Sequence, residues 1–157
     1  MLYAILKTLH VLSIIVWIGG MAFTLFFLRP AVTPLEPPVR LGLMQDVLGR
    51  FFATVMVLIV VTLVTGIWMM TDVAGRLTDP GAAAAMPWSW SLMAALGVLM
   101  MAIFGHIRFV LFKRMRRAVA ASAWAAAGAA MASIRAWVRA NLAIGLLIVT
   151  VVLLTGG

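Results

Sequence analysis

Apolar residues fill four long runs of this chain, and most polar residues lie in the segments between the runs. The runs cover roughly residues 3–28, 51–70, 88–112 and 141–154. They indicate four crossings of a bilayer, and a helix needs about 20 residues for each crossing. Lipid offers backbone amides no hydrogen-bond partner, so each run must be helical. The sequence therefore predicts an all-α integral membrane four-helix bundle, forming a single domain over residues 1–157.

The segments between the runs differ in character. The first begins rich in proline, and a helical extension is predicted over 39–50, because Pro37-Pro38 suits a helix start. A loop with a turn at 79–81 is expected between the second and third runs. The basic, alanine-rich residues 113–140 are expected to extend the third and fourth helices, with a turn near Ser122 or Gly128.

The composition agrees with hydrocarbon as the main solvent. Hydrophobic residues make up 66% of the chain and charged residues only 10%, whereas a soluble domain needs more charge to wet its surface. Cysteine is absent, which excludes disulfides, thiolate metal sites and thiol catalysis. Nucleotide-binding loops and HExxH motifs are also absent, which argues against ATP-driven transport and hydrolysis by this chain. Whether the chain is an enzyme stays open.

The net charge of +8 predicts both partners and orientation. The basic residues lie beside apolar runs, so the lipid bilayer and its anionic lipids are the expected partners, and nucleic acid is not. The positive-inside rule places the first and third connections in the cytoplasm and both termini in the periplasm of a bacterial inner membrane. The sequence is also compatible with a homo-oligomer. The bases of the two connections are Arg29, Arg40, Arg50, Lys113, Arg114, Arg116, Arg117, Arg135 and Arg139, against only Lys7 and Arg76 on the other side.

Histidine inside a membrane span is costly to bury, so His10 indicates a functional site or a bonded partner. It lies near the periplasmic end of the first run and shares a helical face with Trp17. Neutral imidazole binds both copper and haem iron, and this interpretation is favoured over a hydrogen bond to a neighbouring carbonyl. Trp17 could line a porphyrin pocket, although packing in the core is the favoured role.

His106 lies deep in the third run and directly follows Gly105, which would let another helix or a flat ligand approach closely. Hydrogen bonding between helices and cofactor binding are both open for His106. The two histidines are expected about 16 Å apart in depth, at about 1.5 Å per helical residue. One haem bound by both is therefore disfavoured.

Methionine supplies the other candidate metal ligands, with twelve in the chain. Met69, Met70, Met86 and Met93 are expected at roughly the depth of His10. Thioether sulfur is a soft ligand that suits Cu(I), so His10 with two or three methionines would make a copper site. For any one methionine, packing between helices is the favoured interpretation, because its flexible side chain fills gaps.

Three stretches resemble the bacterial copper-resistance D (CopD) family: LKTLHVLSIIVWIGGMAF, RFFATVMVLIVVTLVTGIWMM and NLAIGLLIVTVVLL. The likeness covers nearly the whole chain. It implies an inner-membrane protein that handles copper by Cu(I) binding or transport, with the metal near His10 and the methionines Met69, Met70 or Met93. The matching residues are His10, Trp17, Gly19, Gly20, Arg50, Gly66, Trp68, Asn141 and Gly145.

The opening Lys7, Leu9 and His10 also resemble the HemJ-type protoporphyrinogen oxidases, a family associated with b haem. The stretch PWSWSLM departs from that family, because it lacks the histidine and lysine expected there. This resemblance implies a haem-b electron carrier or oxidoreductase, with His10 or His106 as axial ligand and Trp17 and Gly105 beside the porphyrin. Copper and haem b thus stay open as cofactors. A non-catalytic membrane scaffold is the third alternative.

Overall fold

The computed structural model describes residues 1–77 and 88–155, which contain helices and turns and no strand. Four stretches are long and apolar enough to cross a membrane: Leu2–Val32, Pro37–Gly75, Trp88–Ala120 and Trp124–Leu154. The predicted all-α, four-span fold is therefore confirmed. The elements are α1 (Leu2–Phe23), η1 (Thr24–Leu28), α2 (Arg29–Val32), α3 (Pro37–Leu77), α4 (Trp88–His106), η2 (Ile107–Leu111), α5 (Phe112–Ala120) and α6 (Trp124–Leu154).

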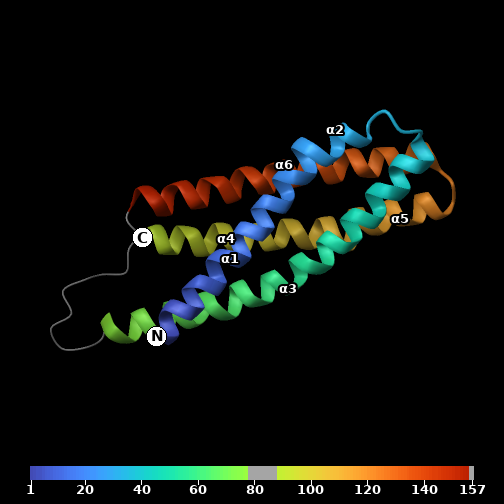
Figure 1. Ribbon diagram of the computed structural model, residues 1–157. Helices are drawn as coiled ribbons and strands as arrows, with labels where there is room; N and C mark the ends of the chain where they lie inside the picture. Colours follow the sequence, from blue (N-terminus) through green and yellow to red (C-terminus); the bar gives the residue numbers. More distant parts are fainter. Residues whose placement is uncertain (78–87, 156–157) are drawn as a thin grey trace.

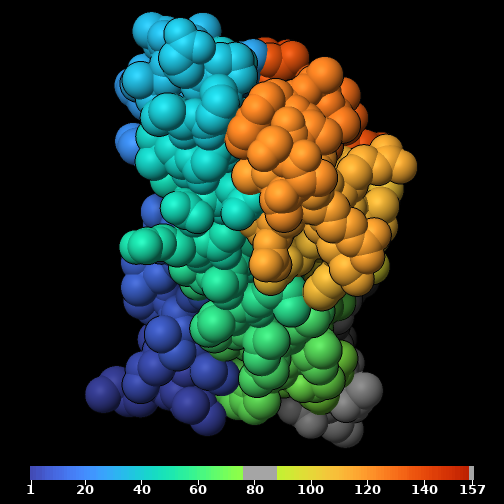
Figure 2. All heavy atoms as spheres, turned by 90° about the vertical axis from the view of Figure 1, so that its right-hand side faces the viewer, coloured from blue at the N-terminus to red at the C-terminus, as the bar shows by residue number. Residues whose placement is uncertain are grey.

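The helices lie side by side, and α1 crosses the others obliquely (Figure 1). Both termini lie at one end of the bundle, which we call the terminal end. The connection from α2 to α3 and the connection from α5 to α6 lie at the opposite end, which we call the basic end because its residues 29–50 and 108–139 carry most of the lysines and arginines. Figure 2 views the molecule from this side and shows the two connections next to each other.

Local sequence explains where the helices begin and bend. Helix α3 begins at Pro37, which needs no backbone N–H at that position. The turn between α5 and α6 lies at Ser122, whose φ of 52° is in the left-handed region, while Gly128 lies inside α6. Two π-helical turns, η1 and η2, continue α1 and α4 toward the basic end. The turn expected at 79–81 lies outside the described residues.

An aromatic cluster joins the helices in the middle of the bundle. The ring of Phe52 makes edge contacts with Phe104 and Phe112, at centroid distances of 5.7 and 5.2 Å. Trp17 of α1 meets Phe104 of α4 at 6.0 Å. These contacts fix the positions of α1, α3, α4 and α5 relative to one another along the bundle.

Large apolar side chains also cover the outside of the bundle. A soluble protein rarely exposes so much contiguous apolar surface, whereas a bilayer solvates it. The described residues thus form a membrane-embedded protein in contact with lipid. Examples on the outer surface are Leu12, Ile15, Phe26, Phe27, Val57, Val64, Ile67, Val98, Leu146 and Leu147.

Candidate functional site

His10 lies along the line of contact between α1 and α3, which we call the groove; these are the two helices in most extensive contact. Its side chain is only 9% exposed. Its Nδ1 lies 2.9 Å from the hydroxyl oxygen of Thr65, across the groove. The imidazole therefore has a bonded partner on the neighbouring helix, as the cost of burying histidine requires.

The hydrogen bonds of Thr65 favour one tautomer of the His10 imidazole. Its hydroxyl has a single hydrogen, which it donates to the carbonyl oxygen of Val61 at 2.6 Å. With that bond made, the same oxygen can accept a hydrogen bond from His10, and the neutral tautomer that donates it carries its proton on Nδ1. Neutral imidazole carries one N–H, so Nε2 keeps its lone pair. This is the arrangement in which histidine binds a metal through Nε2 while a second residue orients the ring.

Gly66 lets the imidazole lie directly on the backbone of α3. A Cβ atom added at Gly66 would lie 3.2 Å from Cε1 of His10 and 3.7 Å from its Nδ1. Most real Cβ atoms keep a larger distance, so a side chain here would require the ring to shift by a few tenths of an ångström. Thr65 and Gly66 thus position His10 as a pair, one by a hydrogen bond and the other by leaving space.

Met69 lies on the same face of α3, one helical turn from Thr65 toward the terminal end. Its side chain is 8% exposed and therefore faces into the bundle. Met70, the next residue, is half-buried on an adjacent face. Of the methionines predicted near His10, Met69 is thus the one whose helical face is the face that holds the imidazole.

Met93 lies between other helices. It lines a small apolar gap between α4 and α6, together with Ile148, Val151 and Val152. That packing matches the gap-filling role expected of a core methionine. Met86 lies outside the described residues.

His106 lies at another level along the bundle than His10, and its side chain faces outward instead of into the bundle. Trp17 is level with Phe104, so the offset between the two histidines along the bundle is roughly 14 Å at 1.5 Å per residue. The His106 side chain is exposed, and its ring contacts Trp137 edge-on at 5.4 Å. Nothing in the described residues lies within 4 Å of a Cβ placed on Gly105, so Gly105 provides no close contact with another helix.

A family model places the chain among known proteins. The model for copper resistance protein D matches residues 45–155, which is more than half of the chain. This chain belongs to the copper resistance protein D family. It is accordingly a multi-pass membrane protein of a copper-resistance family, as the sequence resemblance implied. No curated protein and no solved structure matches it significantly.

The CopD match includes Thr65, Gly66 and Met69 but begins after the first span. His10 therefore enters the site from outside the matched region, and the groove joins the two parts of the chain. The resemblance to HemJ-type proteins stays a prediction, because the family model that matches is CopD.

The residues suggested for a porphyrin site in this CopD protein do not converge. Trp17 packs against Phe104 in the core, about two helical turns from His10, while Gly105 and His106 lie on another surface. His10 itself rests on Gly66 without a gap for a flat ligand on that side. The described residues therefore do not fit a haem held by these side chains.

The described part of the chain also does not support a metal site built from several carboxylate and histidine side chains. Among residues 1–77 and 88–155, no group of three or more His, Asp or Glu side chains could hold a metal ion. What α1 and α3 offer instead is a buried imidazole on one helix and a buried thioether on the other, on the face of α3 that holds Thr65. Thioether is a soft ligand that selects Cu(I), and imidazole also suits copper.

Proposed function

We propose that this CopD-family protein binds Cu(I) in the groove between α1 and α3, with His10 Nε2 and the sulfur of Met69 as ligands. The observation that carries the proposal is the His10–Thr65 hydrogen bond, which orients the ring. With Nδ1 as the donor, Nε2 would keep its lone pair for a metal. Both ligands are buried, so the metal would lose its water and favour soft, neutral donors. The site would hold Cu(I) as cargo during copper handling in the membrane.

The position of the proposed copper site along the bundle indicates from which side of the membrane copper would enter. His10 and Met69 both lie in the half of the bundle nearer the terminal end. The basic residues lie at the other end, and lysine and arginine favour the cytoplasmic face. We therefore propose that the basic end is cytoplasmic in a bacterial inner membrane. Copper would then reach the groove from the periplasm.

A Cu(I) competition titration tests the ligand assignment. The full chain in detergent, without oxygen, competes with a chromogenic Cu(I) chelator, and we expect one copper per chain. Met69→Leu keeps the volume of the side chain but removes the sulfur, so we expect Cu(I) affinity to fall about tenfold or more. The matched control is Met93→Leu, which should keep the wild-type affinity. Equal affinities for the wild type and Met69→Leu would contradict the role of Met69.

Thr65 is expected to act as a positioning residue. Thr65→Val removes the hydroxyl that pairs with His10 Nδ1 by a hydrogen bond, so we expect Cu(I) affinity to fall roughly 10- to 100-fold. Thr65→Ser keeps a hydroxyl and should restore most of that loss. Thr54→Val is the control on the same helix, because the Thr54 hydroxyl donates only to the backbone carbonyl oxygen of Arg50.

The Thr65 variants also need a readout that does not depend on copper. The ¹⁵N chemical shifts of His10 report which ring nitrogen carries the proton. The wild type and Thr65→Ser should show protonated Nδ1, and Thr65→Val should show a mixture. A wild-type His10 protonated at Nε2 would refute this role of Thr65.

A further inference from the structure

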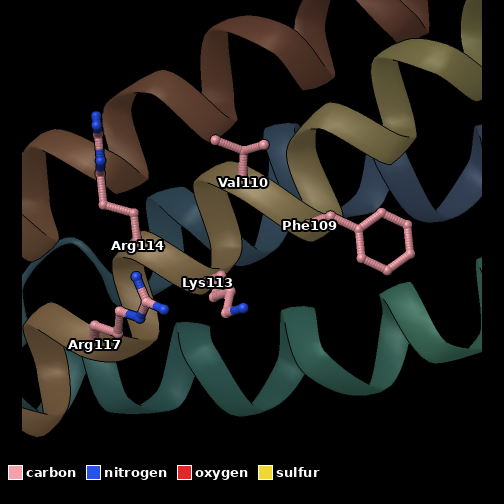
Figure 3. A pocket seen from close by; sticks show the side chains of 5 residues that line it. All are labelled: Phe109, Val110, Lys113, Arg114 and Arg117. Carbon is pink, nitrogen blue, oxygen red and sulfur yellow. The ribbon is translucent and has the colours of Figure 1, made fainter.

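A second candidate site lies on the outer surface of η2 and α5 and is separate from the copper groove. Phe109, Val110, Lys113, Arg114 and Arg117 line an open hollow of about 310 Å³, which we call the basic hollow. All five side chains come from one continuous helical stretch (Figure 3). The hollow is apolar at one end and cationic at the other.

The cations of the basic hollow have no partner within the described chain. Lys113, Arg114 and Arg117 are exposed, and none forms a salt bridge with a carboxylate in residues 1–77 or 88–155. The whole chain contains only four acidic residues. With Arg116, four positive charges lie within the five residues 113–117 and repel one another, so an anion bound there would be stabilised.

The position of the basic hollow relative to the membrane surface indicates which kind of anion would fit it. Phe109 is 60% exposed and continues the lipid-facing surface of α4. The helix rises roughly 12 Å from Phe109 to Arg117, more than the thickness of one headgroup layer. Phe109 and Val110 can therefore contact acyl chains while the three cations reach the phosphates.

We propose that the basic hollow binds the headgroup of an anionic phospholipid, with its phosphate at Lys113, Arg114 and Arg117 and its acyl chains along Phe109 and Val110. A guanidinium pairs with two phosphate oxygens at once, so Arg114 and Arg117 suit this ligand. A small soluble anion has no apolar part that could contact the exposed side chains of Phe109 and Val110. This proposal does not depend on copper binding.

Native mass spectrometry of the full chain in detergent tests this proposal. The protein is titrated separately with dioleoylphosphatidylglycerol and with dioleoylphosphatidylcholine, and we expect the anionic lipid to be retained at least about tenfold more strongly. In the triple variant Lys113→Gln, Arg114→Gln and Arg117→Gln, we expect affinity for the anionic lipid to fall roughly a hundredfold. Inorganic phosphate at matched concentration should not displace the lipid.

A matched control separates the basic hollow from overall charge. The triple variant Lys7→Gln, Arg50→Gln and Arg139→Gln lowers the net charge from +8 to +5, as the hollow variant does, and all three side chains are exposed outside the hollow. It should retain the anionic lipid like the wild type. Equal losses in the two triple variants, equal retention of the two lipids, or displacement by inorganic phosphate would each overturn the proposal.

Discussion

Replacing His10 by alanine is expected to lower Cu(I) affinity by more than about a hundredfold. Changes to residues that merely orient a ligand cost about 10- to 100-fold, and loss of the ligand itself should cost more. The substitution removes the one imidazole in the groove between α1 and α3 and leaves Met69 without a nitrogen partner. Chelator competition on the full chain in detergent measures the change.

His106→Ala is the matched control for this prediction. His106 is exposed at another depth, so its loss should leave Cu(I) affinity within about twofold of the wild type. Helicity and elution volume should be unchanged in both variants, which shows that folding is retained. If His106→Ala lowers the affinity as much as His10→Ala, the copper site does not lie where we place it.

The largest effect on stability is expected for Phe52→Ala. Phe52 is 1% exposed, and its ring contacts Phe104 of α4 and Phe112 of α5. Truncation leaves a cavity where three helices meet. Helix association in a membrane rests on close packing, so we expect a loss of about 3 kcal/mol in the free energy of unfolding.

Unfolding in mixed micelles with increasing sodium dodecyl sulfate measures this change. Phe27→Ala is the control, because Phe27 is 67% exposed and faces lipid. Its effect should stay within about 0.5 kcal/mol. Similar losses for Phe27→Ala and Phe52→Ala would show that the aromatic cluster is not the point that joins the helices.

The fold could be predicted because the solvent dictates it. Four apolar runs in hydrocarbon must be helices, and the prolines and the Ser122 region mark where the helices start and turn. The inward face of each helix could not be predicted in the same way. Both lipid and core are apolar, so no amphipathic pattern tells His106, which faces outward, from His10, which faces inward.

The partner of His10 is the part of the site that the sequence did not reveal. Thr65 is 55 residues away in the chain, and only the packing register of α1 against α3 brings the two together. A signal was present in the adjacent Thr65 and Gly66, a hydroxyl and a missing side chain within the second run. The space that the missing side chain of Gly66 leaves is taken by the imidazole of His10.

X-ray absorption spectroscopy of the Cu(I)-loaded full chain tests the central claim most directly. We predict that the spectrum of the wild type shows one imidazole nitrogen and at least one sulfur bound to copper. The sulfur contribution should fall in Met69→Leu and stay unchanged in Met93→Leu. A copper ion without imidazole, or with oxygen and nitrogen ligands alone, would contradict a site built from His10 and Met69.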